Sequence, residues 1–73
     1  MANLEKQYLI FMGKKIRHYR EKMGLSQEQF GKLSKFHRTY IGMIERGEKN
    51  MTIMNMHKVA KALGVNVKDL IDF

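Results

Sequence analysis

The sequence predicts an all-α domain of five helices, and three of its features support this prediction. Apolar residues recur at spacings of three and four along most of the chain, which gathers them on one face of a helix. Glycine follows three such stretches, where a left-handed residue closes a helix, and proline is absent from all 73 residues. Helices are expected at residues 4–23, 27–33, 37–45 and 53–63, with a short fifth helix after residue 66.

The first helix is expected to bury one face along its whole length. Gly13 interrupts this helix at a cost of about 1 kcal/mol relative to alanine, which indicates either close packing or a loosely held first turn. Gly24 lies where a left-handed residue is wanted, so the helix should end just before it. The expected inward residues are Leu4, Tyr8, Met12, Ile16, Tyr19 and Met23, and the methionines 12, 23 and 56 are expected to fill the core.

Two helices joined by a short turn are predicted in the middle of the chain. Ser26 is a good N-cap for the first of them, because its hydroxyl accepts from backbone N–H groups that lack a helical partner. Phe30 and Leu33 should then point into the core, and Gly31 allows a close approach to the next helix. Residues 34–36 break the pattern, so a new helix is expected to begin directly after them.

The helix at residues 37–45 has two different faces when it is laid out at 100° per residue. Solvated helices usually mix acids and bases on the outer face, but the only acid here, Glu45, lies between the two faces. An outer face with two arginines and no acid suits a polyanion. The inner face carries His37, Tyr40, Ile41 and Ile44, and the outer face carries Arg38, Thr39, Gly42, Met43 and Arg46.

Two further helices complete the predicted fold. Thr52 should cap the fourth helix and Gly64 should close it, with Asn66 and Asp69 at the start of a short fifth helix. The inward residues expected on the fourth helix are Ile53, Met56, Ala60 and Leu63. The C-terminal segment is too apolar for a free tail, so part of it should join the core and the rest should form a two-fold dimer interface. The candidate interface residues are Val65, Val67, Leu70, Ile71 and Phe73.

Composition narrows the possible partners. Fourteen lysines and arginines against seven acidic residues give a formal net charge of +7, so a polyanion is the expected partner. Nucleic acid is the first candidate and an anionic membrane surface the second, while a surplus of surface lysines is the plain alternative. The length corresponds to one small domain, residues 1–73, and a domain this small is often stabilised by a partner subunit.

Several classes of site are disfavoured by the residues present. The chain contains no cysteine, which excludes disulfides, thiolate metal sites and thiol nucleophiles and suits a reducing cytoplasm. No apolar run approaches about 18 residues, and the first 13 residues do not form a secretory signal. His18, His37 and His57 lack metal-ligand spacing, and no nucleophile motif or phosphate-binding glycine loop occurs. We therefore expect no catalysis, no metal and no small-molecule cofactor.

From Leu9 to Phe73 the chain resembles the lambda-repressor-like (Cro/C1, or XRE) helix-turn-helix family of DNA-binding domains. The matching stretches are GKKIR at residues 13–17, GLSQE at 24–28, IERG at 44–47 and VAKALGV at 59–65. Within that family, RTYI at 38–41 followed by IERG and KNMT at 49–52 is most similar to the controller proteins of bacterial restriction–modification systems. Lys35 stands where the family turn usually has glycine, Gly31 where it has alanine, and His37 where it has a stronger cap.

The resemblance implies a regulator that binds a palindromic operator in double-stranded DNA as a homodimer. RNA polymerase is a further candidate partner, and the expected location is the cytoplasm, with the nucleoid. The helix at residues 37–45 would enter the major groove, whose base edges offer distinguishable donors and acceptors. The expected base-reading residues are Arg38, Thr39, Gly42 and Met43, with Arg38 placed to bind guanine.

A second group of residues is expected to hold the DNA backbone without reading sequence. Gln27 begins a helix whose free N–H groups favour an anion, and its position matches the family's phosphate anchor. Tyr40 is equally well interpreted as a ring at the edge of the core. The resemblance also implies a structural ion pair between Arg20 and Glu45. The expected backbone contacts are Gln27, Tyr40, Arg46, Lys49 and Asn50.

Two other functions remain as alternatives. An antitoxin of the same fold would bind a toxin protein as well as its own promoter, but the chain shows no added toxin-binding extension. A membrane-surface helix would need the apolar face of the first helix, which the core is expected to use. We therefore expect no membrane partner.

Overall fold

The computed structural model describes residues 3–73 and confirms an all-α fold. No strand occurs among these residues, and none of their helices is long and apolar enough to cross a membrane. The five helices are α1 (Leu4–Lys22), α2 (Gln27–Ser34), α3 (Arg38–Glu45), α4 (Ile53–Leu63) and α5 (Val67–Leu70). Their order and extents agree with the prediction to within one or two residues.

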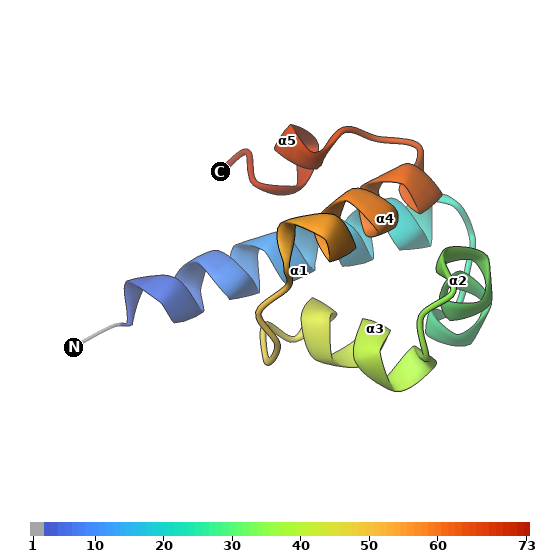
Figure 1. The fold of residues 1–73 in the computed structure, drawn as a ribbon, viewed down its shortest axis with the longest axis horizontal. Coiled ribbons are helices and arrows are strands. Elements are labelled where there is room, and N and C mark those ends of the chain that lie inside the picture. The colour runs from blue at the N-terminus through green and yellow to red at the C-terminus, as the bar shows by residue number, and fades with distance from the viewer. Residues whose placement is uncertain (1–2) are drawn as a thin grey trace.

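Helix α1 runs along the long axis of the molecule and organises the other four (Figure 1). It packs against α3 on one side and α5 on the other, while α2 contacts both α3 and α4. The first turns of α1 project past the remaining helices, which Figure 1 shows as the blue end of the ribbon. This projection leaves Leu4 and Tyr8, at that end of α1, largely exposed.

The core lies where all five helices meet. Each of its fully buried side chains contributes about 1.5–3 kcal/mol through removal from water. Because Leu70 is among them, the short α5 is anchored to the core and is not a free tail. The fully buried side chains are Ile16, Phe30, Ile41, Ile44, Val59 and Leu70.

The helix starts form as the sequence predicts, because each is fixed by a side chain close by. Ser26 Oγ accepts from the Gln29 backbone N–H at 3.0 Å, and Gln29 Oε1 accepts from the Ser26 N–H at 2.8 Å. Thr52 Oγ1 accepts from the Asn55 N–H at 3.1 Å. His37 caps α3 through Nδ1, which accepts from the Thr39 N–H at 3.0 Å. The helix-turn-helix segment is thus capped at both of its helix starts.

Gly13 marks close packing rather than a loosely held turn. A β-carbon at Gly13 would overlap the backbone carbonyl oxygens of Ile44 and Glu45, the last two residues of α3. Gly31 plays a similar part in the turn, where a β-carbon would lie 2.6 Å from the Phe36 carbonyl oxygen. These two glycines let α1 and α2 approach the α3 backbone directly.

Several residues predicted to face the core are exposed instead. Leu33 is 53% exposed because the buried face of α2 is centred on Phe30, Gly31 and Ser34. Ile53 is the first residue of α4 and lies beyond the edge of the core, 65% exposed. Leu4 and Tyr8 lie on the projecting turns of α1, Met23 follows its last turn, and all three are exposed. Val59 and Met51, which were not predicted to face inward, are part of the core.

Candidate nucleic-acid interface

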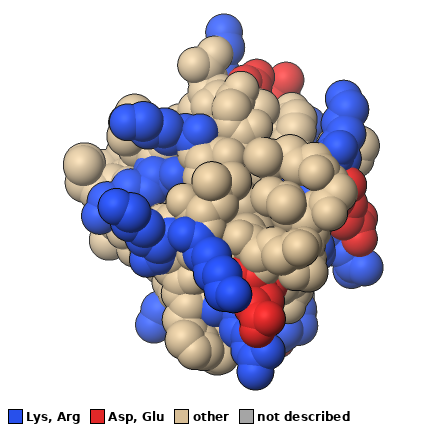
Figure 2. Space-filling model, turned by 90° about the vertical axis from the view of Figure 1, so that its right-hand side faces the viewer, with Lys and Arg blue, Asp and Glu red and all other residues tan. Residues whose placement is uncertain are grey.

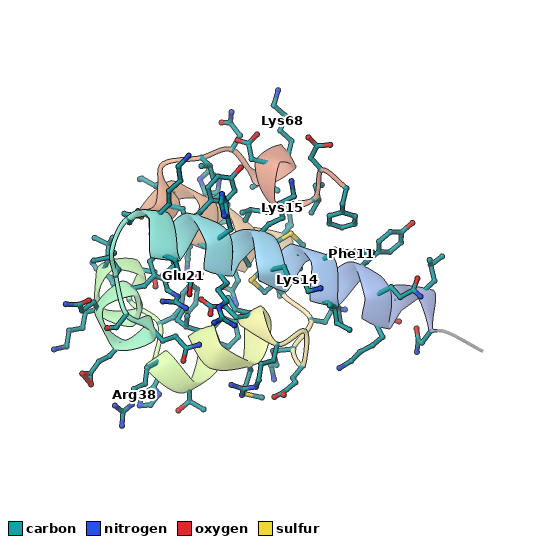
Figure 3. The ribbon with its side chains drawn as sticks, turned by 180° about the vertical axis from the view of Figure 1, so that it is seen from behind. Phe11, Lys14, Lys15, Glu21, Arg38 and Lys68 are labelled. Atoms are coloured by element: carbon teal, nitrogen blue, oxygen red, sulfur yellow. The ribbon has the colours of Figure 1, made fainter. Side chains whose placement is uncertain are left out.

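The outer face of α3 is held on a buried support. Ile41 and Ile44 are 0% and 1% exposed, so α3 cannot rotate without breaking the core. Arg38 and Thr39 on the opposite side are exposed, and Met43 is half-buried. Arg38 extends away from the ribbon at one end of α3, on the side of the molecule opposite Lys68 of α5 (Figure 3). The predicted base-reading side of α3 is therefore largely accessible.

Arg38 makes an ion pair with a neighbouring helix. Its Nη1 lies 3.1 Å from Glu28 Oε2 of α2, and both side chains are more than half exposed. Exposed pairs of this kind contribute little free energy, because water already screens both charges. Arg38 is therefore free to exchange the carboxylate for another acceptor, such as a guanine edge.

Gly42 was predicted to lie among the base-reading residues on the outer face of α3, but in the structure other side chains cover it. It is buried, because the Arg46 guanidinium and the Gln27 side chain cover it. A β-carbon at Gly42 would lie 2.9 Å from Arg46 Nη1 and 3.4 Å from Gln27 Oε1. In this arrangement Gly42 supplies a seat for the Arg46 side chain rather than a surface for bases.

Arg46 is paired with Glu48 in the loop after α3, and no sequence pattern pointed to Glu48. Arg46 Nε donates to Glu48 Oε2 at 2.8 Å and Nη2 donates to Oε1 at 3.2 Å, so the contact is bidentate. The hydrogen bond from Arg46 lowers the pKa of Glu48, and the same bond raises the pKa of Arg46. Lys49 and Asn50 in the same loop are exposed.

Lys6 makes a contact that the sequence did not predict. Its Nζ donates to the Gly47 carbonyl oxygen at 3.0 Å, which ties the projecting part of α1 to the end of α3. The two residues are 41 positions apart, so no local pattern announces the contact.

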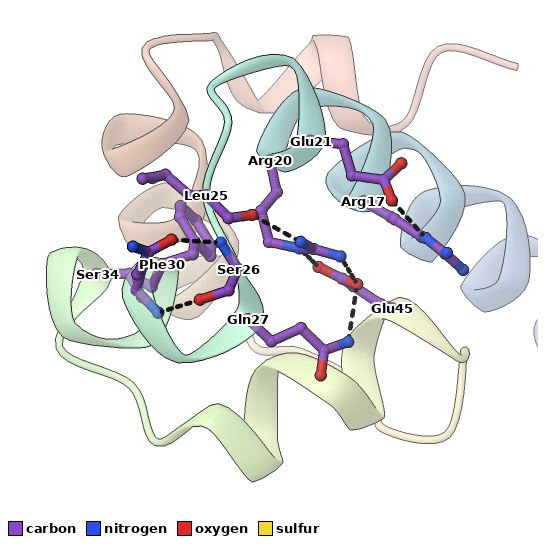
Figure 4. A network of polar contacts seen from close by, with 10 residues as sticks. Arg17, Arg20, Glu21, Leu25, Ser26, Gln27, Phe30, Ser34 and Glu45 are labelled. Atoms are coloured by element: carbon purple, nitrogen blue, oxygen red, sulfur yellow. Dashed lines mark hydrogen bonds and ion pairs between the residues drawn. The ribbon is translucent and has the colours of Figure 1, made fainter.

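A buried ion pair joins α1 to α3, and the structure thereby brings Arg20 and Glu45 together (Figure 4). Arg20 Nε donates to Glu45 Oε2 at 2.6 Å and Nη2 donates to Oε1 at 3.0 Å. Arg20 Nη1 also donates to the Leu25 carbonyl oxygen at 2.7 Å. The hydrogen bond to Glu45 raises the pKa of Arg20, and burial opposes it. This network fixes the position of α3 and does not face solvent.

Gln27 and Tyr40, both predicted to contact the DNA backbone, have partners within the protein. Gln27 Nε2 donates to Glu45 Oε1 at 3.1 Å, which leaves Gln27 half-buried at the start of α2. The Tyr40 hydroxyl accepts from Asn55 Nδ2 at 3.2 Å, and the ring lies 4.9 Å from Phe36 between centroids. These contacts favour the alternative interpretation of Tyr40, a ring at the edge of the core.

Charge is unevenly distributed over the surface. Figure 2 views the end of the molecule that carries α2, and basic side chains lie along its left side, its lower edge and its right side around an uncharged centre. Acidic side chains on this face are fewer and touch basic ones. Within residues 3–73 no group of three metal-ligating side chains occurs.

The candidate dimer interface requires a correction. Leu70 is 0% exposed within one chain, so it belongs to the core and is removed from the interface. Val65 and Val67 are partly buried against that core, whereas Ile71 and Phe73 are 49% and 52% exposed. The core takes Leu70 because α5 packs against both α1 and α4.

Exposed aromatic rings from α1 join the C-terminus at this place. The Phe73 ring lies 5.5 Å from Tyr8 and 5.4 Å from Phe11 between centroids. Leu4, Tyr8, Met56, Ile71 and Phe73 line an open apolar groove there. Leu4 and Tyr8 were missed as surface candidates because helical periodicity assigned them to the core.

Comparison with known proteins places this geometry in context. The helix-turn-helix family HTH_3 matches residues 16–70. The chain is 46% identical over 65 residues to control protein C.BamHI of Bacillus amyloliquefaciens, covering 88% of this chain and 80% of that protein. It is 43% identical over 60 residues to control protein C.SmaI of Serratia marcescens, covering 82% and 71%.

Solved structures give the same result. The restriction-modification controller protein C.AhdI from Aeromonas hydrophila superposes with a TM-score of 0.81 at 39% identity, covering 85% of this chain and 94% of that one. A hypothetical transcription factor from Neisseria superposes with a TM-score of 0.85 at 30% identity, covering 97% and 82%.

Proposed function

We propose that this chain, a member of the HTH_3 helix-turn-helix family, is the controller protein of a restriction–modification system. As a member of that family it is a DNA-binding transcription regulator and not an enzyme. The control proteins from Bacillus and Serratia and the controller structure from Aeromonas support this assignment over an antitoxin. In this role the chain would be a cytoplasmic protein associated with the nucleoid, where it would bind operator DNA.

The observation that carries the proposal is the exposed face of α3 on its buried support. The major groove of B-DNA admits one α-helix, and arginine can donate two parallel hydrogen bonds to guanine O6 and N7. Arg38 and Thr39 are exposed at the start of α3, where the first turn of a recognition helix meets base edges. Met43, further along the same face, would add apolar contact.

Backbone phosphates would be held from both sides of α3. Gln27 lies at the start of α2, whose free N–H groups favour an anion, and its amide already lies beside α3 through Glu45. Arg46, Lys49 and Asn50 would hold the other side from the end of α3 and the loop after it. Such contacts set the position of the protein and supply the salt-dependent part of its affinity.

The binding unit in this proposal is a homodimer on a palindromic operator. A second copy would cover the apolar groove through Leu4, Tyr8, Ile71 and Phe73, which one chain leaves exposed or half-exposed. Two-fold symmetry would then place two α3 helices about 34 Å apart, one turn of DNA. In an activating role, the DNA-bound dimer would also contact RNA polymerase.

Selection of bound sequences from random duplex DNA tests the proposal. The wild-type protein should select a palindrome, and Arg38→Ala should lose preference at one guanine in each half-site, a loss of about 1–3 kcal/mol of discrimination. Lys14→Ala, an exposed change on α1, serves as the control and should keep the wild-type motif. An unchanged motif with Arg38→Ala would remove Arg38 from base reading, and failure of the wild-type protein to bind any duplex would overturn the function.

A further inference from the structure

The Arg46–Glu48 pair occupies the side of the molecule that the proposed function turns toward DNA. Its two hydrogen bonds, at 2.8 and 3.2 Å, use both carboxylate oxygens of Glu48 and two nitrogens of the guanidinium. This is the fork-to-fork geometry with which arginine also binds a phosphate. Glu48 therefore takes up the same donors that a DNA backbone phosphate would need.

The position of Arg46 is defined on its other side as well. The guanidinium lies across Gly42, with Nη1 2.9 Å from the place that a β-carbon would occupy. Gly42 thus allows Arg46 to lie back along α3 toward Gln27 while Glu48 holds its fork. The side chain has a defined seat in the free protein and does not extend freely into solvent.

Glu48 is negatively charged under ordinary conditions. The hydrogen bond from Arg46 lowers the pKa of Glu48, and the nearby Lys6 ammonium acts in the same direction. The Arg46 and Glu48 side chains are 56% and 46% exposed, so water screens their attraction and the pair can open. Arg46 can therefore pass from Glu48 to a phosphate, but the exchange leaves a carboxylate beside the DNA.

We propose that Glu48 is an affinity-limiting residue, which competes with DNA phosphate for Arg46 and keeps binding to duplex of any sequence weak. This inference rests on the proposed function, since it requires a DNA-binding surface at α3. Stable binding then depends on the base contacts of α3, because the backbone contact of Arg46 is largely offset by the release of Glu48.

The exchange has a signature in the salt dependence of binding. A cation that neutralises one phosphate releases counterions, which contributes about −0.9 to the slope of log K against log [salt]. In the wild-type protein the freed Glu48 carboxylate attracts a cation of its own, which cancels part of this release. Without the carboxylate at position 48 the full contribution of Arg46 should appear.

The test compares Glu48→Gln, Arg46→Gln and the double variant on a selected operator and on an unrelated duplex. Glu48→Gln should bind both duplexes about three- to tenfold more tightly, with a slope steeper by up to about 0.9. The gain should vanish in the Arg46→Gln background. Glu21→Gln is the matched control, because Glu21 also pairs with an exposed arginine, Arg17, at 3.2 Å and the substitution changes net charge equally. It should change affinity much less.

Three results would overturn the inference. Weaker or unchanged binding by Glu48→Gln with an unchanged slope would mean that the carboxylate stays on Arg46 in the complex. An equal gain in the Arg46→Gln background, or with Glu21→Gln, would reduce the effect to net charge. Circular dichroism melting checks that each variant is folded. Failure of the wild-type protein to bind duplex DNA would instead reject the proposed function, so the two failures are distinguishable.

Discussion

At the scale of single residues, two helical glycines have opposite surroundings. Gly13 faces the backbone carbonyl oxygens of Ile44 and Glu45, which cannot move without separating α1 from α3. Gly42 faces the end of the flexible Arg46 side chain, which can move at little cost. The same residue type therefore secures a helix contact at one position and makes room for the Arg46 side chain at the other.

Alanine should destabilise the domain at Gly13 but not at Gly42. Gly13→Ala should lower the free energy of unfolding by about 1–3 kcal/mol, because it forces α1 and α3 apart. Gly42→Ala should keep or raise it by up to about 1 kcal/mol, because alanine is the better helix former and only the end of Arg46 must shift. Urea denaturation measures both values. Equal losses at the two positions would contradict the packing described for Gly13.

The buried pair between Arg20 and Glu45 gives a second prediction at this scale. Arg20→Ala leaves Glu45 charged and buried, so the free energy of unfolding should fall by about 3 kcal/mol. Thermal melting should show a drop of about 4–8 °C for each kcal/mol in a domain of this size.

The matched control is Arg17→Ala, which removes an exposed pair with Glu21 on the same helix. It should cost less than about 1 kcal/mol. Arg20→Ala should lower stability, but the folded variant should largely keep the operator preference of the wild-type protein. Equal melting of Arg20→Ala and wild type would show that the pair does not stabilise the fold.

At the scale of elements, the turn between α2 and α3 contains one strained residue. Lys35 has φ 65°, ψ 30°, and it is the only non-glycine residue with positive φ among residues 3–73. The left-handed conformation costs a residue with a β-carbon roughly 1–2 kcal/mol. The turn nevertheless forms, because the Phe36 N–H donates to the Gly31 carbonyl oxygen at 2.9 Å and the helices on both sides are packed.

Lys35→Gly should therefore stabilise the domain. The expected gain in the free energy of unfolding is about 1 kcal/mol, because glycine adopts positive φ without strain but loses more entropy on folding. Lys32→Gly removes the same charge from a helical position in the last turn of α2 and should instead destabilise by about 1 kcal/mol. Chemical denaturation of both variants separates the effect of the turn from the effect of charge. A loss of stability with Lys35→Gly would contradict the claim that Lys35 is strained in this turn.

At the scale of the whole molecule, the projection of α1 creates an unpaired apolar surface. The molecule measures 37 × 23 × 22 Å, and its long dimension follows α1 past the other helices. Tyr8 and Phe11 on α1 meet Phe73 from the opposite end of the chain. In our proposal, a second copy covers this surface.

Phe73→Asp should weaken self-association. A charge in the apolar groove would shift the mass measured by sedimentation toward the monomer, and operator binding should weaken by more than tenfold because the two half-sites are no longer linked. Leu33→Asp is the matched control, since Leu33 is as exposed as Phe73, at 53% against 52%, but lies on α2. It should leave the mass unchanged. A wild-type protein that is monomeric at micromolar concentration would contradict the dimer.

The sequence by itself determined the helices, their caps and the face of α3 that turns outward. Ser26, Thr52, Gly24 and Gly64 act on backbone groups within a few residues, so their effects can be worked out from neighbouring positions. The pairing of Arg20 with Glu45 was also foreseen, but through family resemblance and not through any local pattern. These features depend on short-range geometry or on a fold already known.

Only the tertiary structure decided which apolar side chains are covered and which charged side chains meet. Leu33 and Leu70 look alike in the sequence, yet one is exposed and the other lies in the core. Arg46 covers Gly42 and pairs with Glu48 because of the path that the loop takes after α3. Burial and ion pairing depend on contacts between elements far apart in the chain, and helical periodicity describes one element at a time.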